Sequence, residues 1–230
     1  MTHNAPLYPV FLALEGRHCL VVGLGQVGRR KLAGLLDCGP ASVLVLDTAP
    51  PAAAAAPLLR DARVCFARRA CTEKDVAGRV LVFAATNSTA ENRRVAAWCR
   101  RAGVLCNCAS APEEGGFQAP AVARRPPLGV ALSTGGASPA PALSRRWRGE
   151  LETWLVPRAR MAVLMGRLRP LILALGAETG QNTLLFRKLA ESPLQQWLER
   201  NETERCRLWL QEALPPALHA HLAELLHDLP

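Results

Sequence analysis

The sequence of 230 residues lacks several features that would assign it to a class of protein at once. No apolar run reaches the roughly 18–20 uncharged residues of a membrane span. The first ten residues lack the basic patch and apolar core of a secretory signal. These absences predict a cytoplasmic protein with no membrane partner.

Aromatic residues are scarce, with a single tyrosine, and there is neither a long basic run nor an RNP-like aromatic pattern. Nucleic acid is therefore not an expected partner. None of the eight cysteines forms a CxxC pair, and no histidine lies between His18 and His219. We expect reduced, buried thiols rather than disulfides. We expect no metal site, because the pair Cys106 and Cys108 has no evident further ligands.

Positive charge is unevenly distributed along the chain. The net charge is +9; residues 1–150 hold 19 Lys and Arg against 10 Asp and Glu, whereas residues 151–230 hold 9 against 9. The whole excess therefore lies in the first part of the chain. This favours an anionic partner there, such as a dinucleotide or a polycarboxylate.

Short apolar runs alternate with helical spacing through the first half of the sequence. Such runs are typical of strands buried on both faces of a parallel sheet. Their order predicts an α/β fold with a Rossmann-like parallel sheet. The expected strands span residues 18–25, 42–47, 63–69, 79–86 and 104–109.

The pattern changes after about residue 115. Residues 117–134 predict two strands split by an Arg-Arg-Pro-Pro turn, and a long helix follows, with Ser138 as its N-cap. In the remaining residues the apolar positions recur with the spacing of a helix. We predict a Rossmann domain over 1–115, a small α+β dimerisation segment over 116–150 and a C-terminal helical domain over 151–230.

A glycine motif, GxGxxG, joins the first expected strand to its helix. Its glycines allow a tight turn and a close approach of the backbone to a pyrophosphate, which the helix N-terminus attracts. The alternative is a glycine-rich turn that binds nothing. The residues predicted to contact the cofactor here are Gly23, Leu24, Gly25, Gln26 and Val27.

Three polar residues extend this predicted cofactor site. Asp47 ends the second expected strand, where a carboxylate accepts hydrogen bonds from a ribose 2′-hydroxyl and repels a 2′-phosphate. It favours NAD over NADP, although nearby arginines could accommodate the phosphate, and it could instead cap the strand. Thr86 and Asn87 end the fourth expected strand, where the second nucleotide half is expected or where they only shape the turn.

Three longer stretches, "AATN" at 84–87, "CNCASAP" at 106–112 and "STGGASP" at 133–139, stand in an order and spacing that is typical of one family. With the opening "YPVFLALEGRHCLVVGLGQVG", the sequence resembles the precorrin-2 dehydrogenase / sirohydrochlorin ferrochelatase family of siroheme synthesis. The resemblance covers about residues 7–155. It implies NAD-dependent oxidation of precorrin-2 to sirohydrochlorin, with iron insertion in some members, by a homodimer.

The resemblance also implies a catalytic edge around Asn107 and Ser110. The family places an aspartate, linked to dehydrogenation and metal insertion, where this sequence has Ser110. Metal insertion needs a carboxylate to remove pyrrole protons near a dication. We therefore expect a dehydrogenase with weak or absent chelatase activity, unless Glu113 or Glu114 supplies the acid.

The tetrapyrrole substrate carries many carboxylates, so basic and hydroxyl-rich segments are its expected contacts. These are Arg124, Arg125, Ser133, Thr134, Gly135, Gly136 and Ser138. Two alternatives stay open. The missing aspartate is compatible with a non-catalytic carrier or sensor that binds NAD or tetrapyrroles. The nucleotide motif alone is compatible with an unrelated Rossmann oxidoreductase.

Overall fold

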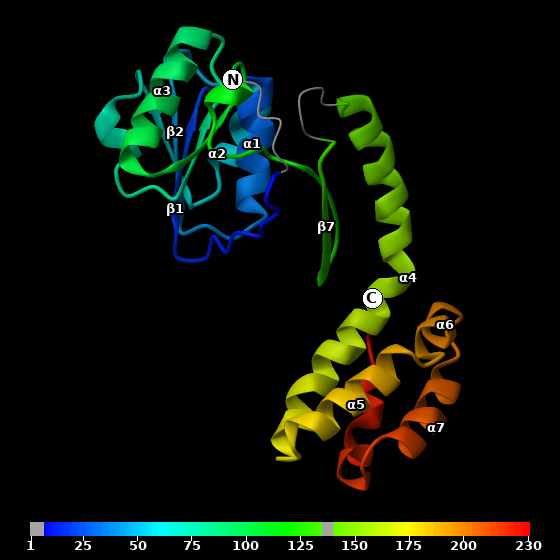
Figure 1. Ribbon diagram of the computed structural model, residues 1–230. Coiled ribbons are helices and arrows are strands. Elements are labelled where there is room, and N and C mark those ends of the chain that lie inside the picture. The colour runs from blue at the N-terminus through cyan, green and yellow to red at the C-terminus, as the bar shows by residue number, and fades with distance from the viewer. Residues whose placement is uncertain (1–6, 135–139) are drawn as a thin grey trace. The chain divides into compact units, whose positions relative to one another are not determined.

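A computed structural model of the protein describes residues 7–134 and 140–230 (Figure 1). Contacts divide these residues into two units, one up to Ala119 and the other from Pro120 onward. The hairpin that follows the sheet thus groups with the helical part of the chain. The predicted boundaries at residues 115 and 150 stay predictions.

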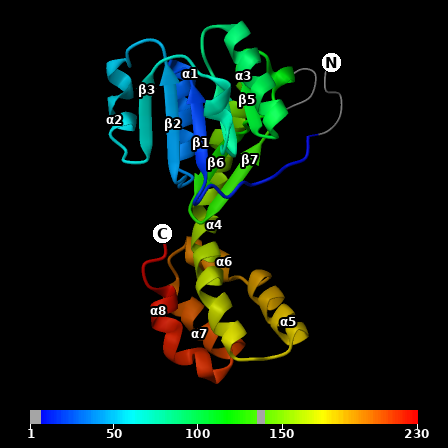
Figure 2. The same cartoon turned by 90° about the vertical axis from the view of Figure 1, so that its left-hand side faces the viewer.

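The first unit is built on a sheet of five parallel strands in the order β3-β2-β1-β4-β5 (Figure 2). The strands are β1 (His18–Val22), β2 (Ser42–Asp47), β3 (Val64–Arg68), β4 (Leu81–Ala84) and β5 (Leu105–Cys108). All five lie within the expected segments, and the Rossmann-like prediction is confirmed. The strand order reverses between β1 and β4, where such sheets bind ligands.

Helices cover both faces of this sheet, so alternate residues of each strand are buried in different clusters. Leu20 and Val22 pack with α3 (Thr89–Ala102), whereas Cys19 and Val21 pack with α1 (Gln26–Leu36) and α2 (Ala56–Leu59). Three short 3-10 helices complete the unit: η1 (Ala53–Ala55), η2 (Glu73–Val76) and η3 (Pro112–Glu114). This two-sided burial explains the near-continuous apolar runs of the strands.

The boundaries of α3 follow from its capping residues. The Ser88 hydroxyl accepts a hydrogen bond from the backbone N–H of Glu91 at 3.2 Å and caps the start of the helix. At the other end Gly103 adopts φ 68°, a left-handed conformation that glycine takes without strain. The helix is therefore fixed in register over β4 and β5, and its inward face has a defined position at the sheet's carboxyl edge.

The second unit begins with the expected hairpin, β6 (Ala121–Arg125) paired antiparallel with β7 (Leu128–Leu132). The helix α4 (Pro141–Ala174) follows, and its N-cap is Ala140. The prediction of Ser138 as the N-cap is therefore wrong, and Ser138 itself lies outside the described residues. The remaining elements are α5 (Thr179–Ala190), α6 (Leu194–Glu199), α7 (Thr203–Ala213), the 3-10 helix η4 (Pro216–His221) and α8 (Leu222–Leu226).

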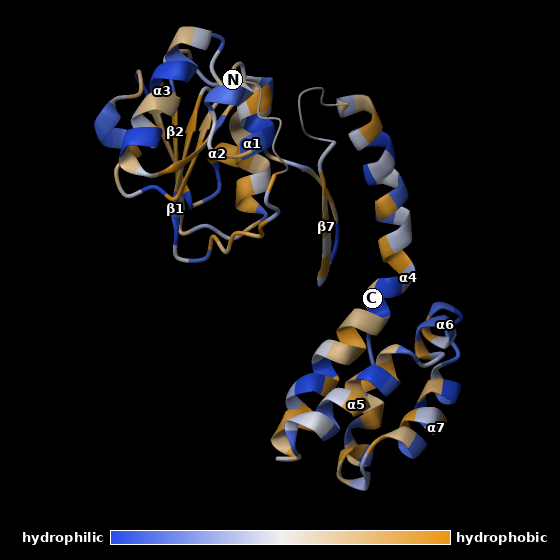
Figure 3. Ribbon diagram, viewed as in Figure 1, coloured by the Kyte–Doolittle hydropathy of each residue, from blue (hydrophilic) through white to orange (hydrophobic). Residues whose placement is uncertain are grey.

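Leucine dominates the core of this helical part, as in Leu164, Leu168, Leu189 and Leu210, each fully buried. Figure 3 shows apolar colouring along the strands of the first unit and on stripes of these helices. In residues 7–134 and 140–230, no helix is both long and apolar enough to cross a membrane. Gly180 lies inside α5, which begins at Thr179.

Candidate functional site

The glycine turn after β1 contains two glycines at which a side chain would clash and one glycine at which a side chain would meet empty space. A Cβ on Gly23 would lie 2.5 Å from the Ala85 carbonyl oxygen, and one on Gly28 would lie 1.9 Å from the Gly23 carbonyl oxygen. Gly23 also adopts φ 94°. A Cβ on Gly25 would meet no atom within 4 Å. Gly23 and Gly28 therefore permit backbone packing, whereas Gly25 leaves room at the surface for a ligand.

The open position lies at the start of α1. Gly25 is the N-cap of this helix, and no side chain caps it. The first turn, with Gln26 and Val27 both exposed, holds no acidic residue. Leu24 differs from its predicted neighbours, because its side chain is buried in the core. Backbone N–H groups and the positive end of the helix dipole thus face open space beside Gly25, which suits an anionic group.

Asp47 ends β2 beside this turn. Its Oδ2 accepts a hydrogen bond from the backbone N–H of Leu24 at 2.6 Å, and its Oδ1 accepts one from Ala49 at 2.9 Å. Each carboxylate oxygen has a second lone pair for a hydroxyl donor. Asp47 therefore holds the turn in shape and is also placed to bind a ribose. The residues present fit a dinucleotide at this edge.

The turn after β4 depends on a residue that the sequence reading missed. Thr86 is half-buried and Asn87 is exposed. The amide of Asn92, which is 0% exposed, bonds the backbone of Thr86 through both its oxygen (2.9 Å) and its nitrogen (3.0 Å). The spacing of the helix could have identified it, because Asn92 lies on the same inward face as Val95, Ala96 and Cys99. A polar residue on that face marks a hydrogen-bond network.

Ser110 lies just beyond β5, at the same carboxyl edge of the sheet. The preceding residue, Ala109, bonds the Ala84 carbonyl at the end of β4, and the Ser110 Oγ accepts from Asn92 Nδ2 at 2.9 Å. Asn107, the other predicted catalytic residue, lies further back on β5. Its Nδ2 donates to the Phe117 carbonyl at 3.2 Å and ties the returning chain to the strand.

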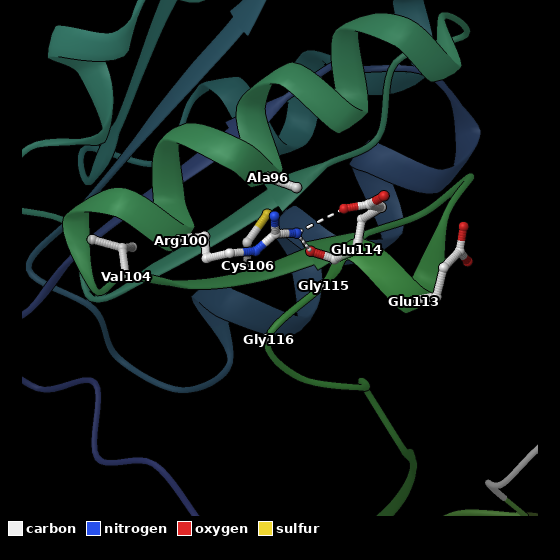
Figure 4. A pocket seen from close by; sticks show the side chains of 8 residues that line it. All are labelled: Ala96, Arg100, Val104, Cys106, Glu113, Glu114, Gly115 and Gly116. Carbon is white, nitrogen blue, oxygen red and sulfur yellow. Dashed lines mark hydrogen bonds and ion pairs between the residues drawn. The ribbon is translucent and has the colours of Figure 1, made fainter. Parts of the chain in front are cut away.

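Glu113 and Glu114, the possible replacements for the family aspartate, both pair with α3. Glu114 lies 2.7 Å from an Arg100 nitrogen, and this bond holds the pKa of its carboxyl below the usual range. Glu113 lies 3.8 Å from Arg93. Figure 4 shows the Arg100–Glu114 pair between α3 and the chain after β5. Both residues line a hollow of about 170 Å³. Both carboxylates are engaged with α3 rather than with Ser110.

The cysteines of β5 are core residues. Cys106 and Cys108 are 2% and 1% exposed and pack with the helix α3. Burial raises the pKa of Cys108, and also raises that of Cys71 to about 12 and that of Cys19 to about 11. Thiols in such surroundings stay protonated and unreactive at neutral pH. Among the described residues, no group of three or more His, Cys, Asp or Glu gathers as a metal site.

Four of the residues predicted to bind substrate belong to the second unit. Arg124 and Arg125 are exposed at the end of β6, and Ser133 is exposed after β7. The Thr134 hydroxyl accepts from the backbone N–H of Ala140 at 3.0 Å and bonds the Ser144 hydroxyl at 2.9 Å. It therefore supports the start of α4. Three predicted residues lie outside the described residues: Gly135, Gly136 and Ser138.

Comparisons with known proteins agree with this geometry. Residues 10–121 match a family model described as putative NAD(P)-binding. A siroheme synthase of Thioalkalivibrio sulfidiphilus is 35% identical over 92% of this chain, and one of Azotobacter vinelandii is 34% identical over 91%. The chain spans only 42% and 46% of the length of these two relatives.

A solved structure also resembles this chain. The structure of SirC, a precorrin-2 dehydrogenase, is 23% identical and covers 96% of this chain and 100% of its own, with a TM-score of 0.65. At that identity the likeness shows a shared fold. The family resemblance drawn from the sequence motifs is nevertheless confirmed by the relatives and the matching family model together. Over about nine tenths of its length the chain is similar to siroheme synthases, and its residues 10–121 match a putative NAD(P)-binding domain.

Proposed function

We propose that the protein oxidises precorrin-2 to sirohydrochlorin with NAD, and that it inserts metal weakly or not at all. The observation that carries the proposal is the edge where the open glycine turn, Asp47 and Ser110 follow strands of one parallel sheet. The names of the relatives and of the solved structure support the substrate class. NAD would supply the hydride acceptor for such an oxidation.

The chain's own residues bind and orient in this proposal. The turn at Gly25 and the N-terminus of α1 hold the pyrophosphate, and Asp47 holds the ribose and disfavours a 2′-phosphate. Alignment of the ring with the cofactor supplies much of the rate enhancement. The oxidation also releases a proton, which passes to water near the Ser110 hydroxyl, because the nearby glutamates pair with arginines.

Weak metal insertion follows from the same geometry. Removal of the pyrrole protons requires a base, and a serine hydroxyl stays protonated at neutral pH. The carboxylates of Glu113 and Glu114 point to Arg93 and Arg100 of α3. We therefore propose that no carboxylate of this loop reaches the ring nitrogens. A carboxylate at position 110 would accept the hydrogen bond that Asn92 now donates to Ser110.

The decisive experiment follows the absorbance of precorrin-2 with NAD or NADP, with and without ferrous iron. We expect oxidation with a preference for NAD and little metal insertion. Ser110→Asp should raise iron insertion without changing NAD affinity, and Ser110→Ala should slow oxidation by less than the 10²–10⁴-fold typical of a lost general acid or base. Binding of the ring without turnover would instead favour the carrier.

Two controls separate the remaining alternatives. If the double variant Glu113→Gln, Glu114→Gln lost oxidation while Ser110→Asp gained no insertion, the acid would lie further along the loop. Activity on small alcohols or acids, with no tetrapyrrole affinity, would indicate an unrelated oxidoreductase. The double glutamine variant also removes two exposed ion pairs. Solvent screens such pairs, so they contribute little to stability and folding should persist.

Substrate binding and assembly complete the proposal. Arg124 and Arg125 are exposed, and we propose that they attract the ring's carboxylates within a homodimer. Attraction between exposed charges is screened within about 8–10 Å at physiological ionic strength. Sirohydrochlorin affinity should therefore fall as salt rises, and salt-independent binding would argue for stacking alone. Sedimentation analysis would establish whether the dimer forms.

A further inference from the structure

Asn92 is a buried polar residue on the apolar face of α3, directly behind the site. Its side-chain amide is 0% exposed. The oxygen accepts from the backbone N–H of Thr86 at 2.9 Å and from the Thr86 hydroxyl at 2.7 Å; the nitrogen donates to the Thr86 carbonyl at 3.0 Å and to the Ser110 Oγ at 2.9 Å. All four hydrogen bonds that an asparagine amide can make are thus present.

The orientation of this amide follows from its partners. The backbone N–H of Thr86 is a donor only, so the Asn92 oxygen must face it, and the NH₂ group must face the Thr86 carbonyl and Ser110. The Ser110 oxygen consequently accepts a hydrogen bond from the buried Asn92 amide. Its own hydrogen is directed away from Asn92 and stays available to a ligand or water.

The side chain of Cys108 also lies near the Ser110 hydroxyl. The Cys108 thiol is within hydrogen-bonding reach of Ser110, but sulfur is a weak acceptor. A carboxylate or a water at the open edge competes with it easily. The Asn92 amide therefore sets Ser110 as a hydrogen-bond donor toward the edge of the sheet.

The same amide reaches the glycine turn through Thr86. A Cβ on Gly23 would lie 2.7 Å from the Thr86 nitrogen, so the backbones of these two turns are in close contact. Asn92 fixes that Thr86 backbone with two hydrogen bonds. A single buried side chain thus joins the turn after β4, which packs on the glycine turn, to the residue at the family's acidic position.

We propose that Asn92 is a positioning residue for the oxidation: it directs the Ser110 hydroxyl toward the tetrapyrrole and couples that residue to the cofactor turn. This inference rests on the proposed function, because it assigns Asn92 to the same reaction. Asn92 touches neither ligand in this role. It acts through Ser110 and Thr86.

The isosteric change Asn92→Asp tests the direction of the hydrogen bond. An ionised carboxylate can accept from Thr86 but cannot donate to Ser110, so the Ser110 hydrogen turns inward. We expect kcat/KM for precorrin-2 to fall at least about tenfold, because the change removes both hydrogen bonds that the Asn92 nitrogen donates, to Ser110 and to the Thr86 carbonyl. As pH falls and the buried acid takes up a proton, it regains a donor, and part of the activity should return.

The control is the same change at the other buried asparagine, Asn182, which is 9% exposed and donates to the Ala177 carbonyl at 3.2 Å within the helical part. Asn182→Asp should lower thermal stability without altering kcat/KM or its pH profile. A merely structural role for Asn92 would make the two variants alike.

A double-mutant cycle with Ser110→Ala decides the proposal. If Asn92 acts through Ser110, Asn92→Asp should cost clearly less in the Ser110→Ala background than in the wild type, in both kcat/KM and the dissociation constant of sirohydrochlorin measured by fluorescence; the loss that remains comes from the bond to the Thr86 carbonyl. Equal fold-losses in both backgrounds would overturn this inference alone. A wild-type protein that neither binds nor oxidises tetrapyrroles would overturn the proposed function itself.

Discussion

The two units of the molecule differ in the buried contacts that hold them together. In the first unit, the turns at one edge of the sheet are held by polar contacts, such as Asp47 on the Leu24 N–H and Asn92 on Thr86. In the second unit, leucines such as Leu164 fill the core, and the charges of residues 151–230 balance. We therefore expect substitutions that disturb the backbone of the turns to reduce ligand binding by the first unit. Substitutions that remove apolar volume should instead reduce the stability of the second unit.

The largest effect is expected from a substitution that disrupts the glycine turn of the first unit. Gly28→Ala would place a Cβ 1.9 Å from the Gly23 carbonyl oxygen, which is a backbone atom and cannot rotate away. We expect a loss of at least about 4 kcal/mol in the free energy of unfolding of this unit, together with loss of NAD binding. Hydrogen exchange by mass spectrometry reads the two units separately.

Two other glycines of the same segment serve as controls. Gly34, in the same helix, has no atom within 4 Å of an added Cβ, and Gly34→Ala should stabilise by roughly 0.5–1 kcal/mol. Gly25→Val should leave folding intact but abolish NAD binding, because its side chain enters the open space at the turn. Full NAD affinity in the Gly25 variant would contradict the cofactor site.

The second largest effect should appear in the helical unit. Leu164 is fully buried among leucines, so Leu164→Ala removes apolar contacts and leaves a cavity. The free energy of unfolding of this unit should fall by about 2–5 kcal/mol. NAD affinity, measured by calorimetry, should stay unchanged. A parallel loss of NAD affinity would show that the two units are energetically coupled and would weaken the comparison.

A smaller effect is expected at the cofactor turn. Asp47→Ala removes the charge-assisted bond that we propose to the ribose and the bond that holds the Leu24 N–H, so NAD affinity should fall by roughly 1–3 kcal/mol. Asp47→Asn keeps an acceptor for Leu24 and removes the charge. It should therefore retain part of the NAD affinity and bind NADP better. Unchanged discrimination in both variants would assign Asp47 to the turn alone.

The order of strands and the glycine turn could be read from the sequence, because apolar runs and glycines act through local geometry. The buried β5 cysteines were also predictable from their alternation. Asn92 was missed because its partners Thr86 and Ser110 lie 6 and 18 residues away, across a turn and a strand. The partners of Glu113 and Glu114 could not be predicted, since their arginines belong to a helix that only the fold brings near.

The smallest expected effect compares acidic residues of the two units. In the first unit, hydrogen bonds from Arg69 hold the pKa of Asp75 well below its usual range, and Asp75 also caps η2 through Thr72. A carboxyl with a depressed folded pKa stabilises above its unfolded pKa, about 3.9, and loses this contribution as pH falls further. Asp75→Asn should therefore lower stability at pH 7 and flatten its decline below about pH 4.

Glu204 of the second unit is the matched comparison. Its pKa is also lowered, by a hydrogen bond from Arg207, but the side chain is 70% exposed and the pair joins neighbouring turns of one helix. Exposed pairs of this kind contribute almost nothing once solvent screens them. Glu204→Gln should leave the acid unfolding curve unchanged. An equal response of both variants would mean that the Asp75 cap contributes no more than a surface ion pair, and polar contacts would then matter no more in the first unit than in the second.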